Sequence, residues 1–154
     1  MTDGFDPGRA REVLGAAARE TLADMTFLDA LPAEGTEEEA AAAERVRAAI
    51  DVLKPASCRL ELQAPEAFRQ KVYEILFPPE EGKETQDDAF LEILNVIAGK
   101  FLTGYFGPAA EIRMELPRFL FPDEGTEGNI LCSLDLDAEG CRLSMALSSI
   151  RYRY

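Results

Sequence analysis

The chain has 154 residues and a formal charge of −13, with 47% hydrophobic and 29% charged residues. This length and composition predict one globular domain spanning residues 1–154 and exclude a disordered chain. The acidic balance disfavours nucleic acids and anionic membrane surfaces as partners. Histidine is absent, which excludes catalytic triads and metal sites that depend on it.

The N-terminal residues show no sign of export. The sequence MTDGFDPGRARE is polar and acidic, whereas a signal peptide is basic and then apolar. No unbroken apolar run has the ~20 residues that span a bilayer, so we expect a cytoplasmic protein without a membrane anchor. The cysteines form neither a CxxC pair nor a disulfide framework, and buried reduced thiols are expected at Cys58, Cys132 and Cys141.

The chain begins with a predicted helix. Asp6-Pro7 is typical of an N-cap followed by a first-turn proline, and apolar residues then recur at helical spacing for about 17 residues. Thr26–Leu31 is predicted as a short strand. The acidic stretch 32–43 is predicted as a loop with a helical turn, and neither it nor the later acidic runs have the residue order of a calcium loop.

A β-hairpin and a second helix come next. Apolar residues alternate over 46–52 and again over 58–62, on either side of Lys54-Pro55-Ala56, which predicts two strands joined by a turn. Pro65 begins a helix that Pro78-Pro79 ends, because proline removes a backbone donor and clashes with the preceding turn.

A third helix is predicted over Gln86–Tyr105, closed by Gly104 and Gly107-Pro108. Three strand-like segments follow, at 111–121, 129–137 and 141–152, and Ala138-Glu139-Gly140 predicts a tight turn between the last two. The order of elements predicts an α/β (α+β) domain with a mainly antiparallel sheet and long helices packed on it.

The third helix is apolar around most of its circumference, which predicts that it is buried. Asp88, Glu92, Asn95 and Gly99 interrupt this pattern at i, i+4, i+7 and i+11. At about 100° per residue these positions fall within a stripe roughly 60° wide. We call these four residues the polar stripe. A solvent-facing surface is the ordinary explanation for such a stripe, but the asparagine and glycine disfavour helix stability and leave a binding role open.

The order Asp88, Glu92, Asn95 on one helix, with Pro117 in a later strand, resembles the signature of the CheC/CheX/FliY family of chemotaxis phosphatases. The resemblance covers most of the chain and is closest to a stand-alone CheX-like domain. It implies a phosphatase that inserts this helix into a phosphorylated receiver domain of a response regulator. Asn95 would position the attacking water, and Glu92 would pair with the receiver's conserved lysine.

Asp88 occupies the family's Asp or Ser position, where it would cap the helix, orient the site or contact the partner, and Pro117 would be structural. Gly99 lowers helix stability, and its missing side chain would leave room for the partner to approach closely. No cofactor or metal of the chain's own is implied, because receivers bring their own Mg²⁺. The first helix has Ala23 at the position where a second asparagine would follow Glu20, so one active site is expected.

Two other interpretations stay open on the sequence alone. In the first, the domain is a non-catalytic binding or adaptor module in a two-component or flagellar-switch system. In the second, the polar stripe is shielded in the interface of a homodimer. The C-terminal residues 150–154 are an available edge for pairing two sheets. The sequence names neither the receiver nor the pathway.

Overall fold

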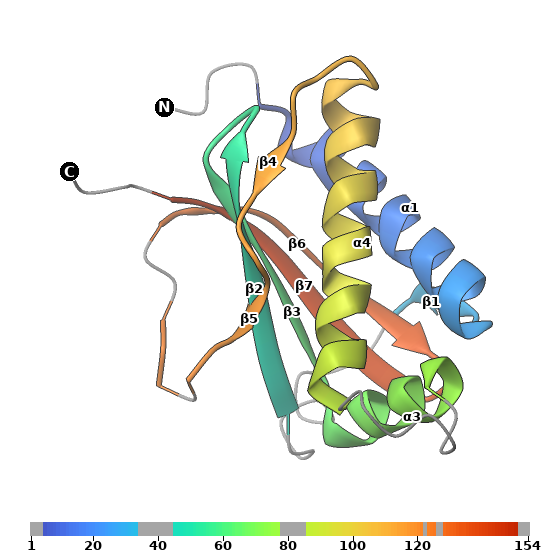
Figure 1. The fold of residues 1–154 in the computed structure, drawn as a ribbon. Coiled ribbons are helices and arrows are strands. Elements are labelled where there is room, and N and C mark those ends of the chain that lie inside the picture. Colours follow the sequence, from blue (N-terminus) through green and yellow to red (C-terminus); the bar gives the residue numbers. More distant parts are fainter. Residues whose placement is uncertain (1–4, 34–44, 78–85, 122, 126–127, 151–154) are drawn as a thin grey trace.

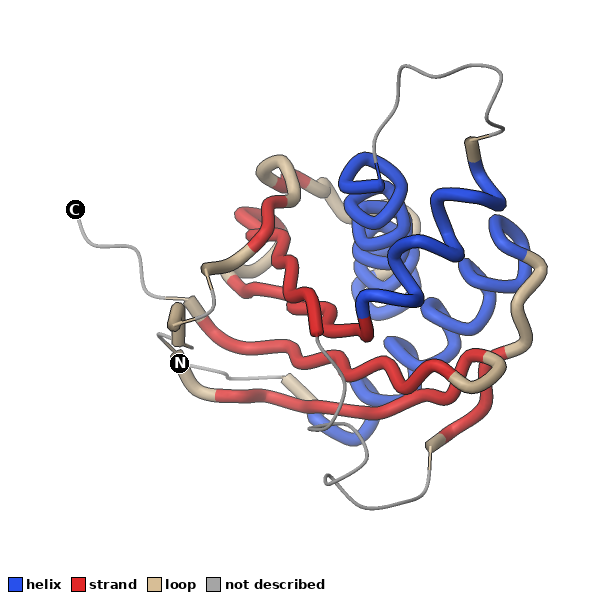
Figure 2. Tube along the Cα trace, turned by 90° about the horizontal axis from the view of Figure 1, so that it is seen from below, coloured by secondary structure: helices blue, strands red, loops and turns tan. Residues whose placement is uncertain are grey.

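The computed structural model describes residues 5–33, 45–77, 86–121, 123–125 and 128–150. They form an antiparallel β-sheet with helices packed on one of its faces (Figures 1 and 2). The α+β architecture predicted from the sequence is therefore confirmed. The helices are α1 (Pro7–Thr26), α3 (Glu66–Leu76) and α4 (Gln86–Phe106). The predicted acidic loop over residues 32–43 lies almost wholly outside the described residues.

The N-terminus of α1 has the predicted cap. The Arg9 backbone N–H donates to Asp6 Oδ1 at 3.2 Å, and Pro7 occupies the first turn. The helix runs three residues longer than the predicted 17, to Thr26, since it has 20 residues. It ends at Phe27, whose left-handed backbone (φ 60°) stops helical hydrogen bonding. The predicted strand at Thr26–Leu31 is therefore wrong in its first half.

Removing the cap is expected to destabilise the domain. Asp6→Ala leaves the Arg9 N–H without its side-chain acceptor, and a loss of about 1 kcal/mol in the free energy of unfolding is expected. Urea unfolding measures the loss, and Asp6→Asn is the matched control because its side-chain oxygen preserves the cap. Equal losses in both variants would contradict a capping role.

The sheet has the strand order β1-β6-β7-β3-β2-β4, with β5 also paired to β2. All of its pairs are antiparallel. The strands are β1 (Ala30–Pro32), β2 (Arg45–Lys54), β3 (Cys58–Pro65), β4 (Arg113–Met114), β5 (Arg118–Phe119), β6 (Ile130–Ala138) and β7 (Cys141–Ser149).

Both predicted hairpins are present. β2 pairs with β3 across the turn at Pro55, and β6 pairs with β7 across Glu139 and Gly140. Glu139 and Gly140 both have positive φ, 50° and 97°, which suits the right-handed twist of a two-residue hairpin loop. The positive φ explains why glycine serves well at the second position.

The single strand predicted over residues 111–121 is wrong, because two short strands stand in its place. The Glu115 N–H donates to Asp51 O and the Leu120 N–H donates to Arg47 O, so β2 is bonded on both sides of an interruption. Pro117 lies in this interruption and has no N–H to donate. Leu116, beside it, is 89% exposed, so its side chain adds no burial that would hold a continuous strand.

The core lies between the helices and the facing side of the sheet. Alternate residues of β3 and β7 point into it, as their burial patterns show. The predicted buried cysteines are confirmed, since Cys58, Cys132 and Cys141 are all buried and unbonded to one another. Burial raises the pKa of the Cys58 thiol to about 12, which keeps it protonated and unreactive.

The helix α4 owes its high hydropathy to this core. Asp87–Phe106 has a mean hydropathy of 1.3 and is long enough to cross a membrane by length and composition alone, although polar residues interrupt its apolar run. Half of that stretch is buried inside the domain. Its apolar side chains pack against the sheet and the neighbouring helices, which accounts for the composition.

On the opposite face of the sheet, Glu124 holds a short loop against β2 and β5. Arg118 Nη2 donates to Glu124 Oε2 at 2.7 Å, and the Phe121 N–H donates to Oε1 at 3.2 Å. These two bonds, in that order of importance, lower the pKa of Glu124 to about 2. The carboxylate therefore stabilises the folded state only while it is ionised.

Glu124→Gln is expected to change how stability depends on pH. Because folding lowers this pKa from its ordinary 4.5, the stabilisation is complete above that pH. It is lost progressively as the pH falls toward 2. Urea midpoints of both proteins measured across this range are expected to differ most at neutral pH and to converge at the acid end. A constant difference at all pH values would contradict this assignment.

Candidate functional site

The helix α4 presents one exposed line of residues on an otherwise buried surface. The following side chains of α4 are buried in the core: Ala89, Phe90, Ile93, Leu94, Ile97, Ala98, Phe101 and Leu102. In the polar stripe, Asp88 and Glu92 are exposed, while Asn95 and Gly99 are half-buried. The structure therefore brings the predicted site residues together on the outer side of α4.

The N-terminal half of α4 is held by α3. Arg69 Nη1 donates to Asp87 Oδ1 at 2.8 Å. In the core, the Phe68 ring of α3 and the Phe90 ring of α4 meet edge to face, with their centroids 6.4 Å apart. Asp87 and Asp88 also place negative charge in the first turn, which the helix dipole favours. The turn that precedes Glu92 is thus fixed by packing and by charge.

The C-terminal half of α4 is held by the start of α1. The Asp6 N–H donates to the Tyr105 hydroxyl at 2.8 Å, and Arg9 Nη2 donates to the Tyr105 carbonyl at 2.9 Å. The Arg9 guanidinium also lies 4.6 Å from the centre of the Tyr105 ring. The helix then ends as predicted at Gly107, whose φ of 99° suits glycine. With both ends anchored, the polar stripe lies on a rigid support.

Within the stripe, Glu92 and Asn95 are one turn apart and therefore neighbours on the helix surface. A carboxylate and an amide side by side supply hydrogen-bond acceptors and a neutral donor. Leu91 and Val96, on either side of the stripe, are half-buried. Such a surface offers hydrogen-bonding groups to a second molecule.

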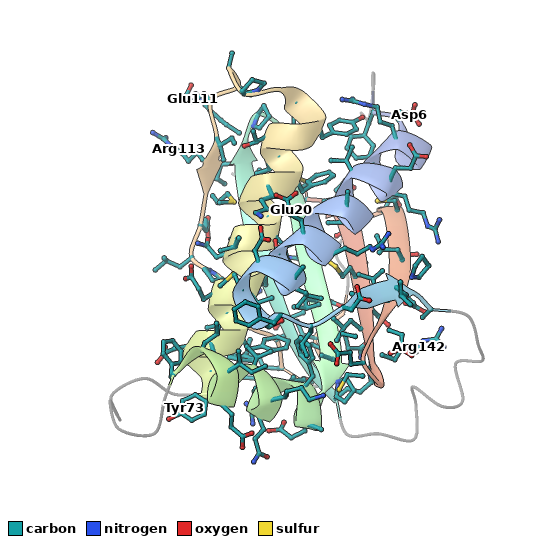
Figure 3. The ribbon with its side chains drawn as sticks, turned by 90° about the vertical axis from the view of Figure 1, so that its right-hand side faces the viewer. Asp6, Glu20, Tyr73, Glu111, Arg113 and Arg142 are labelled. Carbon is teal, nitrogen blue, oxygen red and sulfur yellow. The ribbon has the colours of Figure 1, made fainter. Side chains whose placement is uncertain are left out.

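An ionic cluster borders the stripe on the side of α1. Lys100 Nζ donates to Glu20 Oε1 at 3.1 Å and to Asp24 Oδ2 at 3.3 Å. Figure 3 shows Glu20 where α1 crosses α4. The hydrogen bond that Lys100 donates to Glu20, together with the weaker effect of the one to Asp24, raises the pKa of Lys100. This cluster was not predicted; its only signals in the sequence are the i, i+4 acids on the first helix and a lone lysine within the apolar one.

On the other side of the stripe, the chain between β4 and β5 runs beside α4 (Figures 1 and 3). The Phe119 ring stacks on Phe90 with centroids 5.7 Å apart, which ties this edge to the helix. Pro117 is half-buried and lies in the break between the two strands. Its position suits the structural role that the resemblance implies.

The acidic side chains of the described ranges do not gather into a metal site. No group of three or more histidine, cysteine, aspartate or glutamate side chains among residues 5–33, 45–77, 86–121, 123–125 and 128–150 is arranged to hold an ion. Within those ranges, the functional groups of the candidate site are the amide and carboxylates of the polar stripe.

No protein-family model matches the chain, and no curated protein sequence matches it significantly. Several solved structures do match the chain in fold. The chemotaxis protein CheX from Vibrio vulnificus is 13% identical, with a TM-score of 0.70, and the match covers 94% of this chain and 99% of that one. The CheX of a CheX–CheY–BeF3–Mg²⁺ complex from Borrelia burgdorferi is 17% identical, with a TM-score of 0.63 and coverage of 92% and 98%. FliY from Thermotoga maritima is 13% identical, with a TM-score of 0.57 and coverage of 92% and 87%.

These matches extend over nearly the whole chain. The protein therefore has a CheX/CheC/FliY-type fold, which confirms the fold that the resemblance implied. Identities of this size show the shared fold. The roles of Glu92 and Asn95 are a separate question.

Proposed function

We propose that this protein is a phosphatase acting on the aspartyl phosphate of a response-regulator receiver domain. The observation that carries the proposal is the polar stripe, in which Glu92 is exposed and Asn95 is half-buried on a helix that is anchored at both ends. The fold supports it, because a CheX of this fold was crystallised with CheY, BeF3 and Mg²⁺. Receivers act inside the cell, so we propose a cytoplasmic role in chemotaxis or another two-component pathway.

In the proposed reaction, water attacks the phosphorus of the acyl phosphate. The bond between phosphorus and the receiver's aspartate oxygen breaks, so the carboxylate leaves and the water oxygen and both its protons end on inorganic phosphate. The Asn95 carbonyl oxygen would accept a hydrogen bond from the water and hold it in line. An uncharged amide suits this place, since a carboxylate would repel the phosphoryl oxygens.

Glu92 would fix the register of the complex by pairing with the receiver's lysine, one turn from Asn95. Asp88 would contact the receiver at the start of the helix. The receiver's own Mg²⁺ would neutralise charge on the phosphoryl group. The chain then has only to position water, and orientation of this kind lowers a barrier by several kcal/mol.

The direct test is a time course of phosphoryl loss from receivers phosphorylated with acetyl phosphate. A substoichiometric amount of this protein is expected to accelerate the loss from at least one receiver of the same genome, and the rate is expected to saturate with receiver concentration. Binding without acceleration would support the adaptor alternative. The absence of acceleration with every receiver would overturn the proposal.

A further inference from the structure

The interior of α4 contains two glycines, Gly99 and Gly104, although glycine is unfavourable there compared with alanine. The two positions differ in their surroundings. A Cβ atom at Gly104 would lie 3.0 Å from Cγ1 of Val13 on α1, which is closer than most such contacts. Glycine at 104 is therefore explained by the packing of α1 against α4.

The described residues offer no such explanation for Gly99. A Cβ atom there would meet nothing within 4 Å, and its φ is not in the left-handed region. Alanine would therefore fit the fold and would favour the helix. Gly99 nevertheless occupies the polar stripe, one turn after Asn95, where packing among the described residues does not account for its missing side chain.

The neighbouring lysine leaves the surface at Gly99 open. Lys100 has the long side chain next in sequence, and its ammonium is held by Glu20 and Asp24 on α1 at 3.1 and 3.3 Å. These bonds direct it toward α1 and away from the line of Glu92 and Asn95. The backbone of α4 is thus left accessible where a partner reaching Asn95 would pass.

We infer that Gly99 is a docking residue for the receiver: the receiver's surface packs against the helix backbone at this point, where a larger side chain would hold the two proteins apart. The inference rests on the proposed function. It assigns Gly99 to docking rather than to chemistry or folding.

The test compares Gly99→Ala with Gly104→Ala in the full chain. For Gly99→Ala, the midpoint of thermal unfolding is expected to rise by about 2 °C. Its Kd for a receiver loaded with beryllofluoride and its KM for the phosphorylated receiver are expected to rise about tenfold, because a methyl group at a packed contact is poorly accommodated. Its kcat at saturating receiver is expected to change less than KM does.

Gly104→Ala is the matched control, because it adds the same methyl group to the same helix. Contact with Val13 is expected to remove the gain in unfolding temperature, while KM stays within about twofold of the natural protein. Gly99→Leu extends the series, and a further rise in KM is expected with the larger side chain.

The outcomes separate the inference from the proposed function. If the natural protein accelerates phosphoryl loss and Gly99→Ala has the same KM, the inference is overturned and the phosphatase stands. A lower unfolding temperature for Gly99→Ala would assign the glycine to folding and would also overturn the inference. If the natural protein accelerates nothing, both proposals fail.

Discussion

Asn95→Ala is expected to slow receiver dephosphorylation by roughly 10²-fold or more while leaving the fold intact. The amide is half-buried on the outer side of α4, away from the core residues. Its removal would leave the attacking water without its acceptor, but would open no cavity in the core. The free energy of unfolding should therefore change little, because asparagine is a poorer helix former than alanine.

The measurement is the rate of phosphoryl loss at saturating receiver, together with the Kd for a receiver loaded with beryllofluoride. Loss of rate with binding retained would separate catalysis from docking. Gln70→Ala is the control: it also removes an amide from a helix, here an exposed one, whose bond among the described residues is to Glu74 at 3.3 Å. If both variants kept the full rate, Asn95 would not position the water.

Phe90→Ala is expected to lower the free energy of unfolding by about 4 kcal/mol. The Phe90 side chain is fully buried and is shared by three elements. Its ring meets Phe68 of α3 edge to face and stacks on Phe119 of β5. Alanine would remove both ring contacts and leave a cavity beneath the turn that carries Glu92.

Urea unfolding of the two proteins measures this loss. Typical domains have only about 5–15 kcal/mol of stability, so a large fraction of the protein is expected to lose its fold on mild heating. Leu116→Ala is the control, because this leucine is 89% exposed and its loss should change stability by less than about 0.5 kcal/mol. A loss below about 1.5 kcal/mol for Phe90→Ala would show that the core closes around the gap.

Much of the fold was predictable because its signals are local. The cap at Asp6 and the glycine after α4 depend on neighbouring backbone groups only. The change in apolar period marked β2 and β3 correctly. The prediction failed at residues 111–121, where strand-like composition surrounds Pro117 and pairing with β2 decided the outcome.

The polar stripe was determined by the sequence alone, since residues that interrupt an apolar helix at these spacings share one face wherever the helix packs. What the sequence left undecided were relations between distant residues. The hydrogen bonds of Lys100 to Glu20 and Asp24 join residues that are 80 and 76 positions apart in the sequence.

The two glycines of α4 show most clearly what the sequence determines and what only the tertiary structure decides. As letters in the sequence they are equivalent, and helix propensity assigns both the same penalty. Tertiary packing separates them: Val13, far away in the chain, comes to within 3.0 Å of a Cβ at Gly104, while no described residue lies within 4 Å of a Cβ at Gly99. A steric contact depends on where the rest of the chain lies, so only the folded structure could decide which of the two glycines is required by packing.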